Sequence, residues 1–158
     1  MHIPPDLDIR LIAAVGKRGQ LGLNGKLPWH DAQDLIWFRD CTKEGIVIVG
    51  HRTYEELRSI LPVKTEQPGI GFTTSASRAI IRDESHLNIA QFVAEGDFYG
   101  RPIWIAGGAK TYRRWMPLVR RFYIGKAIVD GQWYDGPADA FLPPLVHRTY
   151  PHPVPTPA

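Results

Sequence analysis

A glycine-bracketed run of β-branched residues, Gly45-Ile46-Val47-Ile48-Val49-Gly50, restricts the fold of this chain more than any other segment. β-Branched side chains favour extended backbone, and the glycines close the run at both ends, so the run predicts a buried strand. Similar apolar runs occupy residues 9–15 and 103–106, while residues 32–42, 53–61 and 110–120 have helical character. Strands that alternate with helices predict an α/β fold around a mainly parallel sheet.

The remaining elements are less distinct in the sequence. Residues 70–74 predict a weaker strand, residues 88–90 another before a brief helix at 91–95, and residues 121–124 with 127–129 the last strand. Residues 16–25 contain four glycines, and we expect them to form a mobile loop.

The chain has 158 residues, the size of one domain, and we expect residues 1–150 to form that domain. Residues 151–158 carry proline at every second position, so we expect a Pro-rich tail outside the sheet. The net charge of +3 is too small to indicate a nucleic-acid-binding surface, and the six histidines have no spacing typical of a metal site. A single cysteine, no signal-peptide pattern and no membrane-spanning apolar run lead us to expect a cytoplasmic protein.

One carboxylate, Asp34, stands among bulky apolar residues. If residues 32–42 are helical, Asp34 shares a face with Leu35 and Phe38. A lone carboxylate on an apolar surface is costly unless a cation or a hydrogen-bond donor meets it. The segment is compatible with a pocket for a flat ligand that has an amidine-like edge, and also with an ordinary exposed Asp34 beside core aromatic residues.

Two predicted strand-to-helix turns have the composition of phosphate-binding turns. Gly50 is followed by His51, Arg52 and Thr53, and Gly107-Gly108 precedes the predicted helix at 110–120. A helix N-terminus offers unpaired N–H groups, and glycine allows a phosphate to approach the backbone closely. Either turn alone is more often a tight connection, but two in one small domain indicate a pyrophosphate held between two helix starts.

These motifs in this order resemble the dihydrofolate reductase family over about residues 9–143. The likeness rests on their combined spacing, and the matching pieces are Ile12-Ala13-Ala14, Gly22 with Leu27-Pro28-Trp29, Asp34-Leu35 with Trp37-Phe38, Val49-Gly50-His51-Arg52-Thr53-Tyr54-Glu55, Gly107-Gly108 followed by Tyr112, and Phe141-Leu142-Pro143. The resemblance implies a three-layer α/β/α domain that binds a small-molecule substrate, with no nucleic-acid or membrane partner.

The resemblance also implies a reaction: hydride transfer from NADPH to C6 of dihydrofolate, with protonation at N5. Asp34 would bind the 2-amino group and N3 of the pterin and help to deliver a proton through water, and its apolar setting would raise its pKa. Trp29 would help to hold that water. The implied substrate-side positions are Ile12, Leu35, Phe38, Leu57, Lys64, Ala106 and Tyr112.

On the cofactor side, the resemblance implies a lid at residues 23–27, a cis bond between Gly107 and Gly108, and a 2′-phosphate site near Thr74 and Ser75. Arg52 would favour NADPH over NADH, because arginine suits the additional phosphate. The implied cofactor positions are Ala14, Gly22, Leu27, Arg52, Thr53, Thr74, Ser75, Gly107, Gly108, Lys110 and Thr111.

The chain also departs from the family pattern. Gly125 stands where the family has a threonine that hydrogen-bonds the catalytic acid, and Lys64 or Gln67 stands where an arginine for the folate α-carboxylate is expected. Ala106 replaces a larger aliphatic residue, which predicts a wider pocket and weaker binding of diaminopyrimidine antifolates such as trimethoprim. Few residues follow Pro143, so we expect the family's C-terminal β-hairpin to be missing, and the exposed sheet edge allows either a monomer or a homodimer.

Two other functions stay open at this level. A reductase of the riboflavin pathway shares the fold and the NADPH turns but reduces a ribosylaminopyrimidine, and Trp29 with Asp34 at pterin-binding spacing argues against it. A catalytically silent protein that binds folate or nucleotide is favoured by Gly125 and the missing arginine, whereas Asp34 and the two phosphate turns favour an enzyme.

Overall fold

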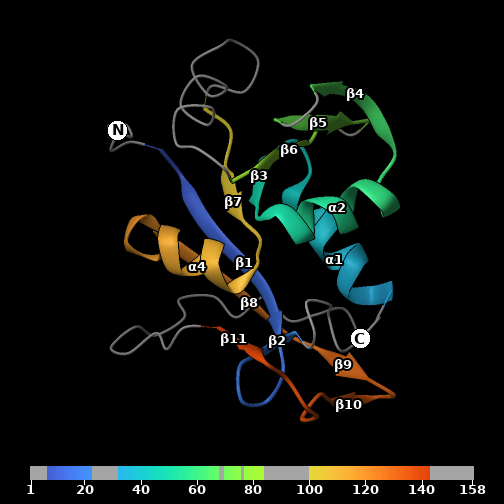
Figure 1. The fold of residues 1–158 in the computed structure, drawn as a ribbon, viewed down its shortest axis with the longest axis vertical. Coiled ribbons are helices and arrows are strands. Elements are labelled where there is room, and N and C mark those ends of the chain that lie inside the picture. The colour runs from blue at the N-terminus through green and yellow to red at the C-terminus, as the bar shows by residue number, and fades with distance from the viewer. Residues whose placement is uncertain (1–6, 23–31, 68–69, 76, 84–99, 143–158) are drawn as a thin grey trace.

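A computed structural model describes residues 7–22, 32–67, 70–75, 77–83 and 100–142, apart from the side chains of residues 32–34. Its centre is a seven-stranded sheet in the order β4-β5-β6-β3-β7-β1-β8 (Figure 1). Five neighbouring strands are parallel: β6 (Ala79–Arg82), β3 (Ile46–Val49), β7 (Ile103–Ile105), β1 (Ile9–Val15) and β8 (Arg121–Lys126). β5 (Gly71–Thr74) joins β6 antiparallel, and β4 (Val63–Gln67) joins β5 antiparallel at the outer edge.

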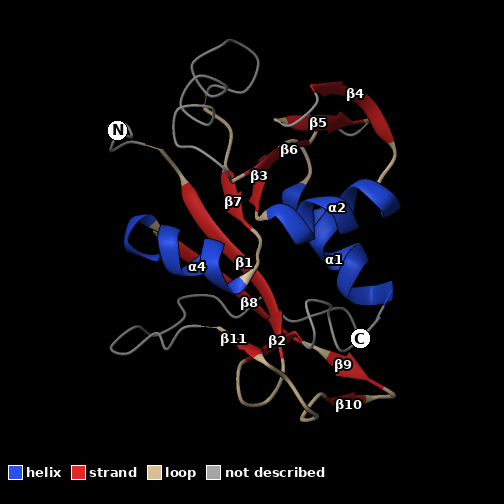
Figure 2. Cartoon of the chain, in the orientation of Figure 1, coloured by secondary structure: helices blue, strands red, loops and turns tan. Residues whose placement is uncertain are grey.

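Helices cover both faces of this sheet, which makes the expected three layers (Figure 2). Helices α1 (Ala32–Thr42) and α2 (His51–Ile60) pack on one face, where Trp37, Tyr54 and Leu57 meet the sheet residues Val47, Val49 and Ile80. Helix α4 (Ala109–Trp115), continued by a 3-10 turn η1 (Met116–Leu118), packs on the other face through Tyr112 and Trp115. Burial of apolar side chains on both faces is what fixes this arrangement.

The α/β fold with a mainly parallel sheet is therefore confirmed, and the bounds of several elements agree closely. β1 and α1 have the predicted limits, and β3 fills the glycine-bracketed run. Helix α2 begins two residues earlier than predicted, directly after its cap Gly50. The helix predicted at residues 110–120 ends at Trp115 and continues as a 3-10 turn with Pro117 in its first turn, because proline cannot donate the next helical hydrogen bond.

Other predictions at the element level were wrong. The last strand predicted across residues 121–129 is two strands: β8 in the main sheet, and β9 (Ile128–Val129), which pairs antiparallel with β10 (Gln132–Trp133). The predicted loop at residues 16–25 contains β2 (Gln20–Gly22), paired with β11 (Ala140–Phe141). Strands β4 and β6 were not predicted at all.

Some predictions fall on parts of the chain that lie outside the described residues. These are the elements at residues 88–95, the lid at 23–27, the tail at 151–158 and the missing C-terminal hairpin. Within the ranges given above, no helix is both long and apolar enough to cross a membrane.

Candidate active site

The two glycine turns predicted to bind phosphate lie side by side. They follow β3 and β7, which are parallel neighbours, so both turns lie at the same edge of the sheet. The backbone N–H of Gly50 donates to the carbonyl oxygen of Gly107 at 2.7 Å, which joins one turn directly to the other. Helices α2 and α4 therefore begin next to each other, at the sheet edge where open α/β folds bind their ligands.

Glycine is required in these turns for two different reasons. Gly107 has a φ of 124°, a backbone conformation that other residues avoid, and its bond to Gly108 is cis, as the family resemblance implied. Gly50 has an ordinary φ of −70°, but a Cβ there would lie 3.0 Å from Oγ1 of Thr111. A Cβ at Gly107 would lie 3.5 Å from Oγ1 of Thr53. The two glycines leave a backbone-lined space that side chains would narrow.

The electrostatics of this edge suit an anion. The cap residues of both helices, Gly50 and Gly108, provide no side-chain hydrogen bond, and neither helix has an acidic residue in its first turn. The first N–H groups of a helix carry its positive dipole end. The exposed side chains of His51, Arg52 and Lys110 surround these helix starts. Residues of the two turns thus fit the diphosphate of a nucleotide cofactor.

The structure does not bring Thr74 and Ser75 to this edge. β6, which was not predicted, is the strand beside β3, and β5 runs antiparallel to β6. The end of β5 therefore lies at the opposite edge of the sheet from Gly50 and Gly107. The predicted 2′-phosphate role of Thr74 and Ser75 is corrected by this topology, because β6 ends at Arg82 on the cofactor edge and β5 does not.

Most of the predicted substrate residues lie on the sheet face that α1 and α2 cover. Buried Ile12 and Leu57 belong to the same core cluster, and the half-buried Ala14, Phe38 and Ala106 pack against it. Leu35 is half-buried on α1. The indole nitrogen of Trp37 is buried in this cluster without a hydrogen-bond partner.

Tyr112 occupies a different environment from the one predicted for a substrate contact. It belongs to the core cluster on the α4 face, and its hydroxyl donates to the carbonyl oxygen of Ile12 at 2.7 Å. Burial raises the pKa of this phenol, so it stays protonated and remains a donor. Tyr112 thus fixes the backbone carbonyl of Ile12 from the sheet face that α4 covers.

Several predicted residues can be placed only in part. Asp34 lies in the first turn of α1, but its side chain is outside the described residues, as are Trp29 and Leu27. Gly22 ends β2, where it pairs with Ala140. Gly125 is buried in β8, opposite Ala14 of β1, so the position that lacks a hydroxyl adjoins a predicted cofactor residue.

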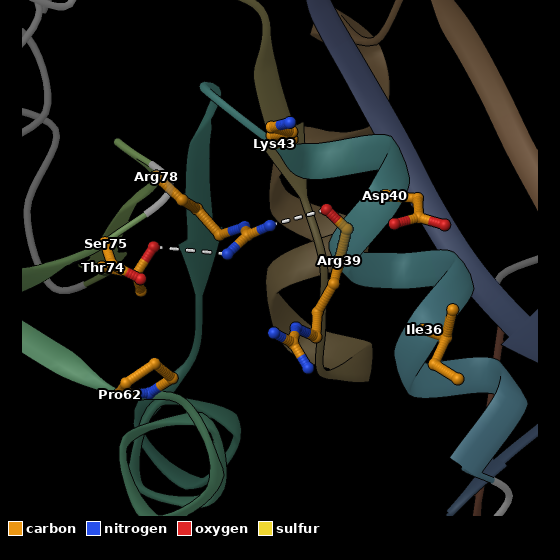
Figure 3. A pocket seen from close by; sticks show the side chains of 8 residues that line it. All are labelled: Ile36, Arg39, Asp40, Lys43, Pro62, Thr74, Ser75 and Arg78. Carbon is orange, nitrogen blue, oxygen red and sulfur yellow. Dashed lines mark hydrogen bonds between the residues drawn. The ribbon is translucent and has the colours of Figure 1, made fainter.

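A pocket of about 380 Å³ opens beside the C-terminal half of α1 (Figure 3). Its α1 wall is a single helix face, because the lining residues Ile36, Arg39, Asp40 and Lys43 have i, i+3, i+4 and i+7 spacing. The opposite wall consists of Pro62, Thr74, Ser75 and Arg78. Three of these eight residues are cationic, and one, Asp40, is acidic.

Arg78 is the buried cation of this pocket, with 3% of its surface exposed. Its Nε donates to Oγ1 of Thr42 at 2.9 Å, Nη2 to the carbonyl oxygen of Arg39 at 2.6 Å, and Nη1 to Oγ1 of Thr74 at 3.3 Å. All three acceptors are neutral. Burial, and then the neighbouring Arg39 cation, lower the pKa of the Arg78 guanidinium. Among the described residues no carboxylate hydrogen-bonds to Arg78, although the nearby Asp40 charge partly opposes the lowering of its pKa, so this buried positive charge can attract an anion.

The residues that the resemblance suggested for a substrate carboxylate do not lie at this pocket, whereas Arg78 does. Lys64 and Gln67 lie on the outer strand β4, where every residue is exposed, and neither lines the pocket. The resemblance predicts an arginine shortly after Pro62, but β4 and β5 lie between that proline and Arg78. The available signal was the basic residue directly before the apolar run Ala79-Ile80-Ile81, which is β6.

Cys41 does not line this pocket. Cys41 is half-buried on α1, where burial and then the Asp40 charge raise the pKa of its thiol, so the thiolate is disfavoured. In the part of the chain that the structure describes, no three His, Cys, Asp or Glu residues are grouped to hold a metal ion.

Comparison with known proteins gives consistent matches along the chain. A family model described as dihydrofolate reductase matches residues 8–152. The dihydrofolate reductase of Buchnera aphidicola subsp. Acyrthosiphon pisum (strain APS) is 30% identical over 156 residues, covering 92% of this chain and 84% of the relative. The dihydrofolate reductase of Haemophilus influenzae (strain Rd) is 27% identical over 135 residues, covering 85% and 78%.

A relative with a different name also matches. The dihydromethanopterin reductase of Methylorubrum extorquens (strain AM1) is 28% identical over 132 residues, which covers 82% of this chain and 91% of the relative.

Proposed function

The chain belongs to the dihydrofolate reductase family, and we propose that it catalyses the NADPH-dependent reduction of 7,8-dihydrofolate to tetrahydrofolate. The observation that carries this proposal is the juxtaposition of the Gly50 and Gly107 turns at one sheet edge, above the apolar face that holds Ile12, Leu57 and Phe38. A diphosphate and a flat apolar ring require these two surfaces next to each other.

The cofactor would be held by backbone N–H groups at the starts of α2 and α4, with Thr53 and Thr111 beside the two glycine turns. The exposed Arg52 at the start of α2 supports a preference for the 2′-phosphate of NADPH. NADPH, when bound there, would supply the hydride for C6 of the substrate.

The substrate would lie along α1, from the pterin ring near Asp34 to the pocket near Arg78. Arg39 follows Asp34 by five residues, a rise of about 7.5 Å along the helix, so one ligand can extend from one to the other. Leu35 and Phe38 on α1, with Leu57 on α2, would hold the ring and the linker by apolar contact. The guanidinium of Arg78 would receive the anionic end of the tail.

In the proposed mechanism, Asp34 orients the pterin by accepting hydrogen bonds from its 2-amino group and N3. It also helps a water molecule, held by Trp29, to deliver the proton that N5 gains when C6 gains hydride. Ala106 and the carbonyl of Ile12, which Tyr112 fixes, would border the reacting ring. The apolar cluster around them excludes water and strengthens these polar contacts.

A second candidate is the reduction of dihydromethanopterin. The specific support is the match to a dihydromethanopterin reductase across 91% of that relative's length. The reducible ring is a dihydropterin in both cases, so the two candidates differ in the tail that the Arg78 pocket receives.

The test is to follow NADPH oxidation by the purified protein with dihydrofolate, and separately with dihydromethanopterin. We expect dihydrofolate to have the higher kcat/KM, and NADPH to be used in preference to NADH. A higher kcat/KM with dihydromethanopterin would favour the second candidate. Binding of NADPH by fluorescence without reduction of either pterin would indicate a silent binding protein or a reductase of another substrate.

We also propose that β8, an outer strand among the described residues, pairs with β8 of a second copy of the chain. In the described part of the sheet, β8 is an outer strand bonded to β1 alone, and edges of this kind are usually covered. Light scattering of the purified protein should then give twice the monomer mass of 17.8 kDa. A single species of monomer mass at working concentration would contradict this proposal.

A further inference from the structure

The hydroxyl groups of Thr42 and Thr74 both accept a hydrogen bond from Arg78, but they differ in whether their own proton is already donated. Thr42 Oγ1 accepts from Nε of Arg78 and donates its own proton to the carbonyl oxygen of Phe38 at 2.7 Å. Thr74 Oγ1 accepts from Nη1 of Arg78, and its proton has no acceptor among the described residues. A hydroxyl can donate and accept at once, so Thr74 retains a donor that Thr42 has already used.

This remaining donor lies in the pocket and is protected from water. Thr74 lines the cavity (Figure 3) and is only 2% exposed, so bulk water has little access to its hydroxyl group. Its position is fixed by backbone bonds on both sides: Thr74 N–H donates to the Arg78 carbonyl at 2.9 Å, and Ser77 N–H donates to the Thr74 carbonyl at 3.1 Å. The tight turn between Thr74 and Arg78 thus holds the two side chains together.

The Arg78 guanidinium adds donors next to that hydroxyl. It has five N–H groups, of which three are bound to Thr42, Arg39 and Thr74, so two remain. Two N–H groups and one O–H form a set of donors without an acceptor, which fits the oxygens of a carboxylate. The exposed cations Arg39 and Lys43 at the same pocket add attraction for an anion.

We infer that Thr74 determines how tightly this pocket holds a carboxylate at the end of the substrate's tail, by donating its hydroxyl proton to that carboxylate while it accepts from Arg78. The inference rests on the proposed function, since it assigns the tail of that substrate to this pocket. It also gives the β4–β5 hairpin a function, because Thr74 is the last residue of β5 and Pro62 precedes β4.

The experiment compares two substrates with the same ring. We would measure KM and kcat of the wild type and Thr74→Val for 7,8-dihydrofolate and for 6-methyl-7,8-dihydropterin, which has no tail. Valine keeps the shape of threonine and removes the hydroxyl. We expect the KM for dihydrofolate to rise about tenfold, as one hydrogen bond to a charged group is lost, with kcat nearly unchanged. The KM for the tail-less pterin should stay the same.

Two further variants separate binding from structure. Thr74→Ser keeps the hydroxyl and should retain the wild-type KM for dihydrofolate. Thr73→Val is the matched control, because the neighbouring hydroxyl of Thr73 contacts Thr65 on β4 rather than Arg78. An unchanged KM for dihydrofolate in Thr74→Val would overturn the inference, and so would an equal rise in KM for both pterins.

A binding measurement distinguishes failure of the inference from failure of the proposed function. Titration calorimetry with p-aminobenzoyl-L-glutamate, a fragment that carries only the tail, requires no turnover. If the wild type reduces neither pterin but binds this fragment more tightly than Thr74→Val does, the proposed function fails and the inference stands. Equal binding by the two proteins, or no binding by the wild type, would overturn the inference.

Discussion

At the scale of single residues, the candidate site depends on positions where the side chain is small or lacking. Gly50, Gly107 and Ala106 each keep side-chain volume away from the places where the cofactor and pterin are proposed to lie. At Gly107 the positive φ favours glycine, whereas at Gly50 the φ is ordinary and a Cβ would instead come too close to Oγ1 of Thr111. Substitution of either glycine should therefore destabilise the protein for a different physical reason, and a second substitution that relieves one loss should not relieve the other.

Alanine at Gly107 should lower the free energy of unfolding by about 1–3 kcal/mol, because a side chain at a φ of 124° is strained whatever surrounds it. Alanine at Gly50 should also destabilise, but through contact with Oγ1 of Thr111. Urea denaturation of a double-mutant cycle checks this. Thr111→Ala should reduce the cost of Gly50→Ala and leave the cost of Gly107→Ala unchanged. An equal effect on both would contradict the assignment.

Ala106 should weaken the binding of diaminopyrimidine antifolates, because it fills less of the proposed pterin pocket than a larger aliphatic residue would. Ala106 packs at the edge of the cluster that holds Ile12 and Leu57, and its N–H is fixed to Ile48. We expect Ala106→Ile to lower the inhibition constant of trimethoprim by about tenfold, the effect of one or two buried methylene groups. Equal inhibition of the two proteins would show that the pocket width does not matter.

At the scale of elements, the sequence predicts those that are buried and regular, and misses those that depend on distant partners. β1 and β3 were predicted with nearly correct bounds, because each is a short, mostly apolar run that a glycine closes. β4 has the polar sequence Val-Lys-Thr-Glu-Gln and exists only as the edge partner of β5. β6 was not predicted either, and Arg78, which directly precedes it, was overlooked.

The segment between β1 and β2 depends on such distant partners. Gln20 is fully buried: its Oε1 accepts from Arg18 N–H at 2.7 Å, and its Nε2 donates to Asp135 Oδ1 at 3.3 Å and to the Gly136 carbonyl at 3.2 Å. The N–H of Lys17 donates to the Tyr134 carbonyl at 2.7 Å. These contacts fasten the chain just before the proposed lid at residues 23–27.

Gln20→Leu should therefore lower the free energy of unfolding by about 1–2 kcal/mol, since it removes the hydrogen bonds to Arg18, Asp135 and Gly136, whose groups can bind water instead. Hydrogen bonds from Arg18 and then Gln20 hold the pKa of Asp135 below its ordinary value of 3.8. The stabilisation from the ionised Asp135 should be complete above that value and be lost as the pH falls through the lowered pKa. Denaturation of the wild type and Asp135→Asn across this range checks the sign. A difference between them that grows as the pH falls would contradict it.

At the scale of the whole molecule, one helix links the two ends of the proposed substrate. Helix α1 carries Asp34 at its start and the Arg39 wall of the Arg78 pocket toward its end, while Trp37 anchors it to the sheet. The cofactor turns follow the C-terminal ends of β3 and β7, whereas the tail pocket lies at the N-terminal end of β6, where the antiparallel β5 ends. A ligand along α1 therefore spans the face between them, as an extended pterin with an anionic tail requires.

The most direct test of this account is the rate of NADPH oxidation with dihydrofolate for the wild type, Asp34→Asn and Asp130→Asn. Asp130 is the control, because it is an exposed carboxylate in the turn between β9 and β10 and lines neither the Arg78 pocket nor the glycine turns. We predict turnover by the wild type and Asp130→Asn, and a fall in kcat of about a hundredfold or more in Asp34→Asn. Full activity in Asp34→Asn, or none in the wild type, would contradict the account.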